Sequence, residues 1–381
     1  MTQERIPKLM LKFSLPAIIG LLVNALYNII DSIFVGNGVG DLALAGVTVC
    51  FPFITAYMAC IMLIGMGATS LISIRLGEKK EGEAEKIVGN AFVLFLIIGV
   101  IITLLGLIFL KPILIFFGAS PDVLPFATII SYSVTSTWVL YHFLSGKSTL
   151  KIKLENLKLK RLVVNSILLI GFPTFVLQVT GSIQQLILNR SLAHYGGDTA
   201  LAVIGIIMSI VTLLVMPAMG ISQGAQPIIG FNYGARQFKR VKDTLKLSIV
   251  SATALVTIGF VFSKIWPTQL ISLFNDKPEL IELGVHGMDI FFKFLPLIGM
   301  QMISASYFQA VGKPNQATLL SLSRQIIIFI PLLIVLPLYW GLEGVWWSGP
   351  FSDLGAFILT GLWLWVEIKR LNKDSSIHNK S

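Results

Sequence analysis

The hexapeptide Gly40-Asp-Leu-Ala-Leu-Ala45 returns 157 residues later as Gly197-Asp-Thr-Ala-Leu-Ala202, and each copy lies between two long apolar stretches. Further identities keep the same spacing without a gap. They include Pro16 with Pro173, Gly67-Ala68 with Gly224-Ala225, Gly77 with Gly234, and Pro121 with Pro278. Chance similarity between apolar stretches would not keep Pro, Gly and Gly-Asp in register. We therefore infer that the chain contains an internal duplication.

The composition places both copies in a membrane. Hydrophobic residues make up 55% of the 381 residues, charged residues make up 13%, and the mean hydropathy is +0.83. A soluble domain carries roughly 25% charged residues, so most soluble enzymes are excluded. A membrane-crossing helix needs about 20 apolar residues. We expect ten such helices, over residues 13–35, 44–74, 88–110, 127–144, 163–188, 200–231, 247–266, 284–310, 317–339 and 345–368.

The basic residues favour one side of the membrane. The two termini, the turn at Lys313 and the loops at 75–86, 145–161 and 233–246 hold 23 Lys and Arg residues, whereas the alternate loops hold 4. Cytoplasmic loops carry the excess of Lys and Arg, so both termini are predicted to be cytoplasmic. The net charge of +10 is then explained by topology and by contact with anionic lipid rather than with nucleic acid.

The two copies differ in length. The first has 157 residues and the second has 224, and the difference of 67 corresponds to about two spans with their connections. Residues 284–343 have no counterpart in the first half, where the register is lost after Pro121. We therefore expect two parallel helical bundles: an N-terminal lobe over 1–160 with about four spans, shortened near 121–127, and a C-terminal lobe over 161–381 with about six. This is a 4+6 arrangement derived from a 6+6 design.

Several stretches have a distinctive sequence. They are Gly220-Ile-Ser-Gln-Gly-Ala-Gln-Pro-Ile-Ile-Gly-Phe-Asn-Tyr-Gly-Ala235, Tyr307-Phe-Gln-Ala-Val-Gly-Lys-Pro314, Leu26-Tyr-Asn-Ile-Ile-Asp-Ser-Ile-Phe-Val-Gly36, Ser323-Arg-Gln325, and Gly344-Val-Trp-Trp347 with Asp353. In these stretches the chain resembles the multidrug and toxic compound extrusion (MATE) transporters, specifically their MepA-like branch, and the resemblance covers essentially the whole chain. The family has twelve helices in two six-helix lobes, so the resemblance implies that this chain lacks the fourth and fifth. It also implies a bacterial cell membrane.

Asp31 is the main candidate for binding a coupling cation. It lies within the first span, where an ionisable side chain is costly and is functional by default. A carboxylate there can exchange a proton or bind Na⁺; the alternative is a hydrated side chain near the outer interface. The resemblance implies that Asp31 binds the cation together with Thr128, which matches the family's helix-six Thr. The family's helix-five Asn and Asp have no match here, which would weaken or abolish coupling.

Other polar residues are candidates for a substrate cavity. They are Tyr27, Asn28, Gln184, Gln223 and Gln226. Tyr27 offers an aromatic face to flat cations, and the glutamines can hydrogen-bond a substrate. The alternatives are packing for Tyr27 and hydrogen bonding between helices for the glutamines. Pro16 is either a hinge or a static kink.

Two further expectations concern charged side chains within the spans. Asp289 and Lys293 are four residues apart and are expected to pair on one helix face. Arg324 is expected near the cytoplasmic end of its span, where its side chain can reach the interface.

The predicted function is export of amphipathic, often cationic compounds in exchange for H⁺ or Na⁺, with two lobes that alternate access. We expect no enzyme activity, no cofactor, no metal beyond a possible Na⁺ at Asp31, no nucleic acid and no obligate protein partner. Gly146-Lys147-Ser148, for example, lacks the upstream Gly of a phosphate-binding loop. One alternative is a transport-inactive deletion product. Another is a lipid-linked saccharide flippase, which is disfavoured because only Lys293 and Arg324 are basic within spans.

Overall fold

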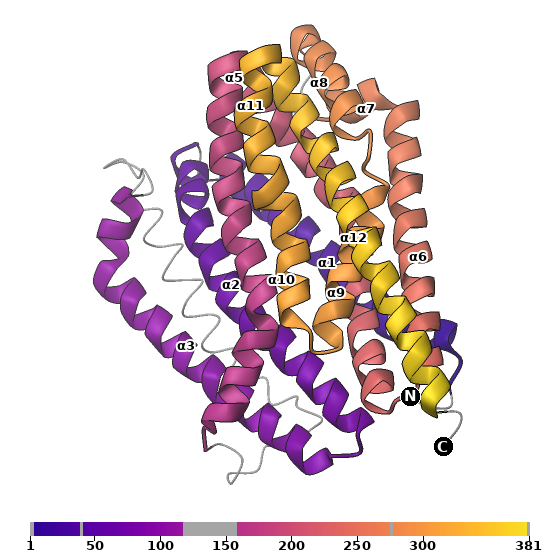
Figure 1. The fold of residues 1–381 in the computed structure, drawn as a ribbon. Coiled ribbons are helices and arrows are strands. Elements are labelled where there is room, and N and C mark those ends of the chain that lie inside the picture. The colour runs from indigo at the N-terminus through magenta and orange to yellow at the C-terminus, as the bar shows by residue number, and fades with distance from the viewer. Residues whose placement is uncertain (1–3, 39–40, 117–157, 275–276, 379–381) are drawn as a thin grey trace. The chain divides into compact units, whose positions relative to one another are not determined.

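The computed structural model describes residues 4–38, 41–116, 158–274 and 277–378, and among them it describes the backbone alone for residues 24–56, 103, 105–107, 109–116, 198 and 373–378. This part of the chain is helical and contains no β-strand (Figure 1), which confirms the all-α prediction. The helices are α1 (Ile6–Gly38), α2 (Asp41–Gly77), α3 (Glu81–Phe116), α5 (Arg161–Gly234), α6 (Phe238–Ile265), α7 (Pro267–Ser272), α8 (Pro278–Phe291), α9 (Leu297–Ala310), α10 (Pro314–Leu322), the π-helix η2 (Ser323–Phe329), α11 (Ile330–Trp340) and α12 (Leu342–His378).

Eight segments of the described residues are long and apolar enough to cross a membrane. They are Ile6–Val23, Tyr57–Gly77, Glu81–Ile102, Arg161–Gly197, Thr199–Gly234, Phe238–Ile265, Pro314–Trp340 and Leu342–Asn372. The chain is therefore a multi-pass membrane protein, as predicted. The expected span at 127–144 lies outside the described residues.

The duplicated Gly-Asp pair marks a helix boundary in both halves. In the first half, α1 ends at Gly38 and α2 begins at Asp41. In the second half, Gly197 interrupts the 74 residues of α5 with φ 64° and ψ −162°. A positive φ of this kind favours glycine, because a Cβ would be strained there. The repeated sequence thus lies at the boundary between two helices in each copy.

The continuous helix expected over 284–310 is wrong. The structure divides it into α8 and α9, with a turn over residues 292–296. Pro296 accounts for the break, since it has no N–H to donate and disfavours the helical conformation in the residue before it. The expected Asp289–Lys293 pair fails for the same reason. Asp289 instead pairs with Lys264 of α6, and the Lys293 ammonium lies 4.6 Å from the centre of the Trp347 ring.

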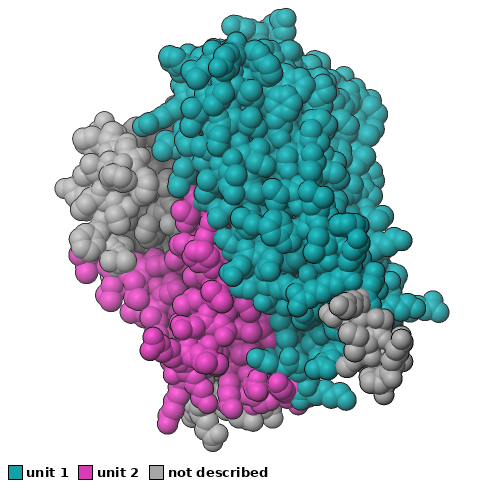
Figure 2. Space-filling view, in the orientation of Figure 1, with its two compact units in different colours: residues 1–22, 73–79, 180–381 teal, residues 23–72, 80–179 magenta. Residues whose placement is uncertain are grey.

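Contacts group the chain into two compact units, coloured in Figure 2. Unit 1 contains residues 1–22, 73–79 and 180–381, and unit 2 contains residues 23–72 and 80–179. These units do not follow the predicted lobe boundary at residue 160, because the first turns of α1 and the last turn of α2 group with the second half, while residues 161–179 of α5 group with the first. The two-lobe assignment stays a prediction.

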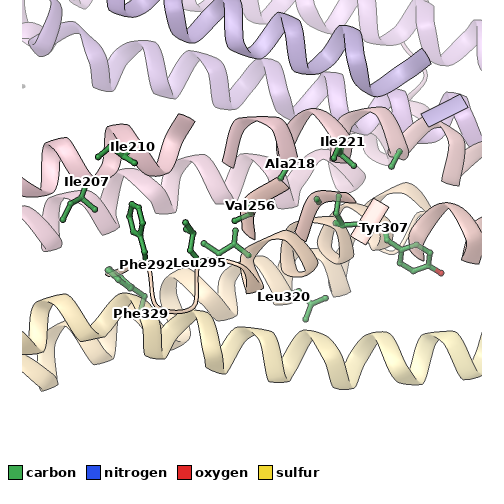
Figure 3. Packing of buried hydrophobic residues seen from close by; sticks show 14 of the residues in the cluster. Ile207, Ile210, Ala218, Ile221, Val256, Phe292, Leu295, Tyr307, Leu320 and Phe329 are labelled. Atoms are coloured by element: carbon green, nitrogen blue, oxygen red, sulfur yellow. The ribbon is translucent and has the colours of Figure 1, made fainter. Parts of the chain in front are cut away.

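Each unit has its own apolar core. In unit 2, the buried positions of α2 are Ile64, Ala68 and Leu71, and those of α3 are Ile87, Ala91 and Leu94. Both sets follow the i, i+4, i+7 spacing of one helix face. The larger core of unit 1 joins α5, α6, α9 and α12, and Figure 3 shows part of it. Its largest fully buried side chains are Trp346, Tyr307, Phe292 and Phe308.

Candidate functional site

The structure locates the predicted site residues to different degrees. Asp31, Tyr27 and Asn28 lie on α1, in the part that is described by its backbone alone, and Thr128 lies outside the described residues. The glutamines lie on the two parts of α5. Gln184 and Gln223 are less buried than Gln226, which is 1% exposed and so suits packing between helices. That these residues line one cavity stays a prediction.

Glycines bring α1 and the second part of α5 into backbone contact. A Cβ built at Gly224 would lie 2.6 Å from the Cα of Ser14, and one built at Gly220 would lie 2.8 Å from the Cα of Ile18. Both helices belong to unit 1 over these residues. Since the opposing atoms are backbone, no rotamer change could make room. We call this contact the α1–α5 crossing.

The corresponding contact in unit 2 joins α2 to the first part of α5. A Cβ at Gly67 would lie 3.0 Å from the backbone nitrogen of Gly171, and a Cβ at Gly171 would lie 2.6 Å from the carbonyl carbon of Leu63. We call this contact the α2–α5 crossing. Gly67 corresponds to Gly224 and Gly171 to Ser14 at the offset of 157 residues. The same pair of positions therefore meets in both crossings.

A third contact is reciprocal. A Cβ at Gly77 would lie 2.9 Å from the carbonyl carbon of Phe231, and a Cβ at Gly234 would lie 2.9 Å from that of Ile74. All four residues belong to unit 1, and Ile74 corresponds to Phe231 at the offset of 157 residues. The ends of the two second helices thus touch through equivalent atoms, as a local two-fold relation requires.

Each crossing helix carries a proline close to its contact residue. Pro16 follows Ser14 by two residues in α1, and Pro173 follows Gly171 by two residues in α5. A proline in a helix interior lacks the N–H for the bond to the carbonyl four residues earlier, which weakens the helix there. α1 nevertheless continues through Pro16, whose side chain is exposed. Both crossings therefore lie beside a point where the helix can bend.

Polar side chains hold the segment before each crossing helix. Arg240 of α6 donates to the carbonyl of Glu4 at 2.7 Å and to the Asn232 side chain at 3.1 Å. In unit 2, the Asn90 side chain of α3 accepts from the backbone N–H of Lys160 at 2.7 Å. The start of α6 also contacts the end of α12, since Lys242 donates to Asn372 at 2.6 Å. The N-terminal segment and the end of α12 therefore lie on one side of unit 1.

A second anchor joins α9 to α12. Tyr307 donates to the Glu367 carboxylate at 3.2 Å, and Lys313 pairs with the same carboxylate. Gly312, with φ 74°, forms the turn that precedes Lys313. The distinctive stretch from Tyr307 to Pro314 thus forms the end of α9 and a turn that is held against α12.

Arg324 and Asp353 form an ion pair that sequence reasoning missed. Arg324 donates through Nε to Asp353 Oδ1 at 2.7 Å, so its expected path to the interface is wrong. Gln301 donates to the Asp353 carbonyl at 2.5 Å, and Ser352 donates to the Arg324 carbonyl at 2.6 Å. The signal available in the sequence was one acid and one base on successive apolar spans.

The sequence of this chain matches a model of a known protein family. A family model described as MatE matches residues 16–150 and 173–335, which is most of the chain. The chain belongs to the MATE family. Both prolines, the glycines Gly67, Gly220 and Gly224, and the turn at Gly197 lie within the matched residues, so they belong to the part of the chain that the family shares.

Two curated relatives extend the match. The chain is 26% identical over 412 residues to "Multidrug export protein MepA" of Staphylococcus haemolyticus (strain JCSC1435), covering 91% of this chain and 90% of that protein. It is 24% identical over 435 residues to the protein of the same name from Staphylococcus aureus (strain MSSA476), covering 97% and 96%. The second alignment is longer than the 381-residue chain, so that relative has residues with no counterpart here.

Solved structures agree with the fold. A structure of the "MATE multidrug transporter DinF-BH", solved as a complex with a ligand, matches with a TM-score of 0.85 and 34% identity over 96% of both chains. A second structure, described as the outward-facing conformation of a multidrug resistance MATE family transporter, matches with a TM-score of 0.87 at 22% identity, covering 97% and 98%. The latter supports the fold alone.

Proposed function

We propose that this chain is a multidrug efflux transporter that exports amphipathic, often cationic compounds in exchange for H⁺ or Na⁺. The observation that carries the proposal is the MATE family match over most of the chain, together with relatives named as multidrug exporters over at least 90% of both sequences. An export role requires no enzyme chemistry. Within the part of the chain that the structure describes, no group of three His, Cys, Asp or Glu side chains could hold a metal.

The repeated crossings give this function a mechanical basis. Transporters of this design alternate access by rocking one bundle against the other around a central site. A close helix contact beside a point where the helix can bend is suited to such a motion. Pro16 beside the α1–α5 crossing suits a hinge of this kind, and Pro173 occupies the same position in the other copy.

We assign coupling to Asp31, with Thr128 as its second ligand. A carboxylate within an apolar helix can bind a cation from one side and release it to the other, since the bare charge is costly there. Tyr27, Asn28, Gln184, Gln223 and Gln226 are the proposed contacts for the substrate. The protein is proposed to lie in a bacterial cell membrane with cytoplasmic termini, in contact with lipid and without nucleic acid, cofactor or obligate protein partner.

One observation favours a second candidate function, an inactive membrane scaffold. The staphylococcal alignment of 435 residues exceeds the length of this chain, and the repeat predicts that the shortfall removes two helices of the first half. A chain of this kind would insert and fold without exporting any substrate.

Export of ethidium separates the two candidates. Cells that express the chain are loaded with ethidium, and the loss of fluorescence is compared with cells that carry an empty vector. Faster loss than in empty cells, abolished by Asp31→Asn at equal protein level, supports the transporter. Equal retention in all three strains supports the inactive scaffold.

A further inference from the structure

The Arg324–Asp353 pair lies near the middle of two membrane spans. At about 1.5 Å per residue, Asp353 lies ~16 Å from the start of α12 at Leu342, and Arg324 lies ~15 Å from the start of its span at Pro314. The apolar core of a bilayer is about 30 Å thick. Both charges therefore lie at the depth where transporters of this class bind substrates and coupling ions.

The two partners are buried to different degrees. The Asp353 side chain is 7% exposed, whereas the Arg324 side chain is 38% exposed. Asp353 is thus fixed on α12, which packs against both α9 and η2, while Arg324 has room to move. If the two groups part, the carboxylate stays in the protein interior and the guanidinium is the group that leaves.

Arg324 lies in a backbone segment that can change register. η2 is a π-helix from Ser323 to Phe329, and π-helical turns within α-helices are rare and frequent at functional sites. Reverting such a turn to α-helix would shift Arg324 relative to α12. The bond from Ser352 to the Arg324 carbonyl holds the present register, so the two states differ in a defined contact.

Gln301 provides an acceptor beside the pair. Its Nε2 donates to the Asp353 carbonyl, which fixes the orientation of the amide. Its Oε1 is buried, and within the described chain it has no hydrogen-bond partner; the residue as a whole is 7% exposed. A protonated Asp353 would bring a hydroxyl donor to the region where this acceptor is unsatisfied.

The other charged side chains of the adjoining helices either form pairs of their own or lie near a helix end: α8 carries Glu279 and Glu282 in its first turns, α12 carries Lys369 and Arg370 in its later turns, and Lys293 lies against the Trp347 ring in the turn before α9. α9, α10 and α11 contain no Asp, Glu, Lys, Arg or His, and their titratable groups are Tyr307 and Tyr339. In α8, Asp289 pairs with Lys264 of α6, and His286 pairs with Glu343 at the start of α12. In α12, Glu367 pairs with Lys313 near the opposite end.

We propose that Asp353 is a second proton-binding residue of the transport cycle and that Arg324 positions it. The proposal rests on the export function above. In one state, the Asp353 carboxylate pairs with Arg324 and the pair is neutral. In the other, a proton from the aqueous phase adds to a carboxylate oxygen, Arg324 is released, and the local charge becomes positive. A cationic substrate is favoured by the first state and repelled by the second, which links substrate entry to proton release.

Proton release on substrate binding tests the proposal. Purified full-length protein in a weakly buffered solution is mixed with ethidium, and released protons are measured with a pH-sensitive dye. With Asp31 and Asp353 both titrating, the wild type is expected to release about two protons per ethidium, and Asp31→Asn about one. The double variant Arg324→Gln/Asp353→Asn is expected to release about one, and the triple variant none.

The double variant removes both charges together, so that neither charge remains buried alone. Its folding is checked by a single symmetric peak in size-exclusion chromatography. The matched control is Lys264→Gln/Asp289→Asn, which neutralises an exposed pair and is expected to release as many protons as the wild type.

The inference is overturned if the folded double variant releases as many protons as the wild type. It is also overturned if the variant keeps that release but loses a dependence of ethidium binding on Na⁺, because Asp353 would then bind Na⁺ instead. A wild-type protein that neither binds nor exports ethidium contradicts the proposed function itself. A wild type that exports ethidium beside an unchanged double variant contradicts only the role of Asp353.

Discussion

The two glycine crossings use the same positions and distribute their glycines differently. In the α1–α5 crossing, both glycines, Gly220 and Gly224, lie on α5 and face ordinary residues of α1. In the α2–α5 crossing, Gly67 lies on α2 and Gly171 on α5. The glycine at the equivalent positions Gly67 and Gly224 is therefore common to both crossings, whereas the other glycine lies on the second helix of its copy in one crossing, as Gly220, and on the first helix of its copy in the other, as Gly171. In a membrane, where lipid is as apolar as the protein interior, close backbone contact of this kind is a main source of helix association.

The largest effect is expected at the α2–α5 crossing. A Cβ at Gly171 would overlap the Leu63 carbonyl, so Gly171→Ala must separate two backbones. Overpacking of core side chains costs about 1–3 kcal/mol; an overlap with backbone is expected to cost more, so we expect loss of the monodisperse peak in fluorescence size-exclusion chromatography. Gly99→Ala in α3 is the control, since nothing lies within 4 Å of its Cβ. Similar size-exclusion profiles for the two variants would show that the two backbones are not in close contact at Gly171.

The second-largest effect is expected at the ion pair between Arg324 and Asp353 in the second half of the chain. Arg324→Gln leaves the Asp353 carboxylate buried without its cation, which costs about 3 kcal/mol for a buried pair. Adding Asp353→Asn is expected to recover much of that loss, as measured by thermal unfolding of the purified protein. Lys264→Gln breaks an exposed pair and is expected to cost less than about 1 kcal/mol. Similar losses for Arg324→Gln and Lys264→Gln would contradict the burial of Asp353.

The third effect concerns Asn90 and Arg240, the polar side chains that hold the segments before α5 and α1. Asn90 is 1% exposed and donates to the Lys86 carbonyl at 2.8 Å as well as accepting from Lys160. Removing its side chain is expected to cost about 1–2 kcal/mol, the usual loss when a buried group loses its hydrogen bonds. Arg240→Ala is expected to cost a similar amount. Because Asn90 and Arg240 belong to different units, their losses in thermal unfolding should add; a double variant no worse than either single variant would show that they act on one element.

The smallest effect is expected at the prolines. Pro16→Ala restores a helix N–H beside the α1–α5 crossing and stiffens α1. We expect ethidium export to slow about threefold, or roughly 0.7 kcal/mol in barrier, with unchanged folding. Pro173→Ala tests whether the other copy bends in the same way. Export at the wild-type rate in both variants would assign the prolines a static role.

Much of the fold was predictable because it follows from local chemistry. Hydropathy located most spans, and the repeated Gly-Asp pair located the helix boundary at Gly197, since a positive φ favours glycine. The break at 292–296 was missed because the apolar stretch runs through it, although Pro296 was visible. The offset of 157 residues indicated which glycines of the two copies correspond, but it could not show which residues are in contact in the fold.

The polar contacts were less predictable, because they join residues that are far apart in sequence. Arg324 and Asp353 are separated by 29 residues and meet only because η2 packs on α12. The same holds for Arg240 and Glu4, which are 236 residues apart. Asp31 could be singled out from its position alone, because an acid within an apolar span is unusual whatever it touches.

The measurement that tests cation-coupled export most directly is ethidium transport by the purified protein in proteoliposomes under an imposed pH or Na⁺ gradient. We predict transport against the ethidium gradient that depends on one of the two cation gradients and is abolished by Asp31→Asn in protein that still folds. Absence of cation-driven transport in the folded wild-type protein would contradict the proposed export and favour an inactive scaffold.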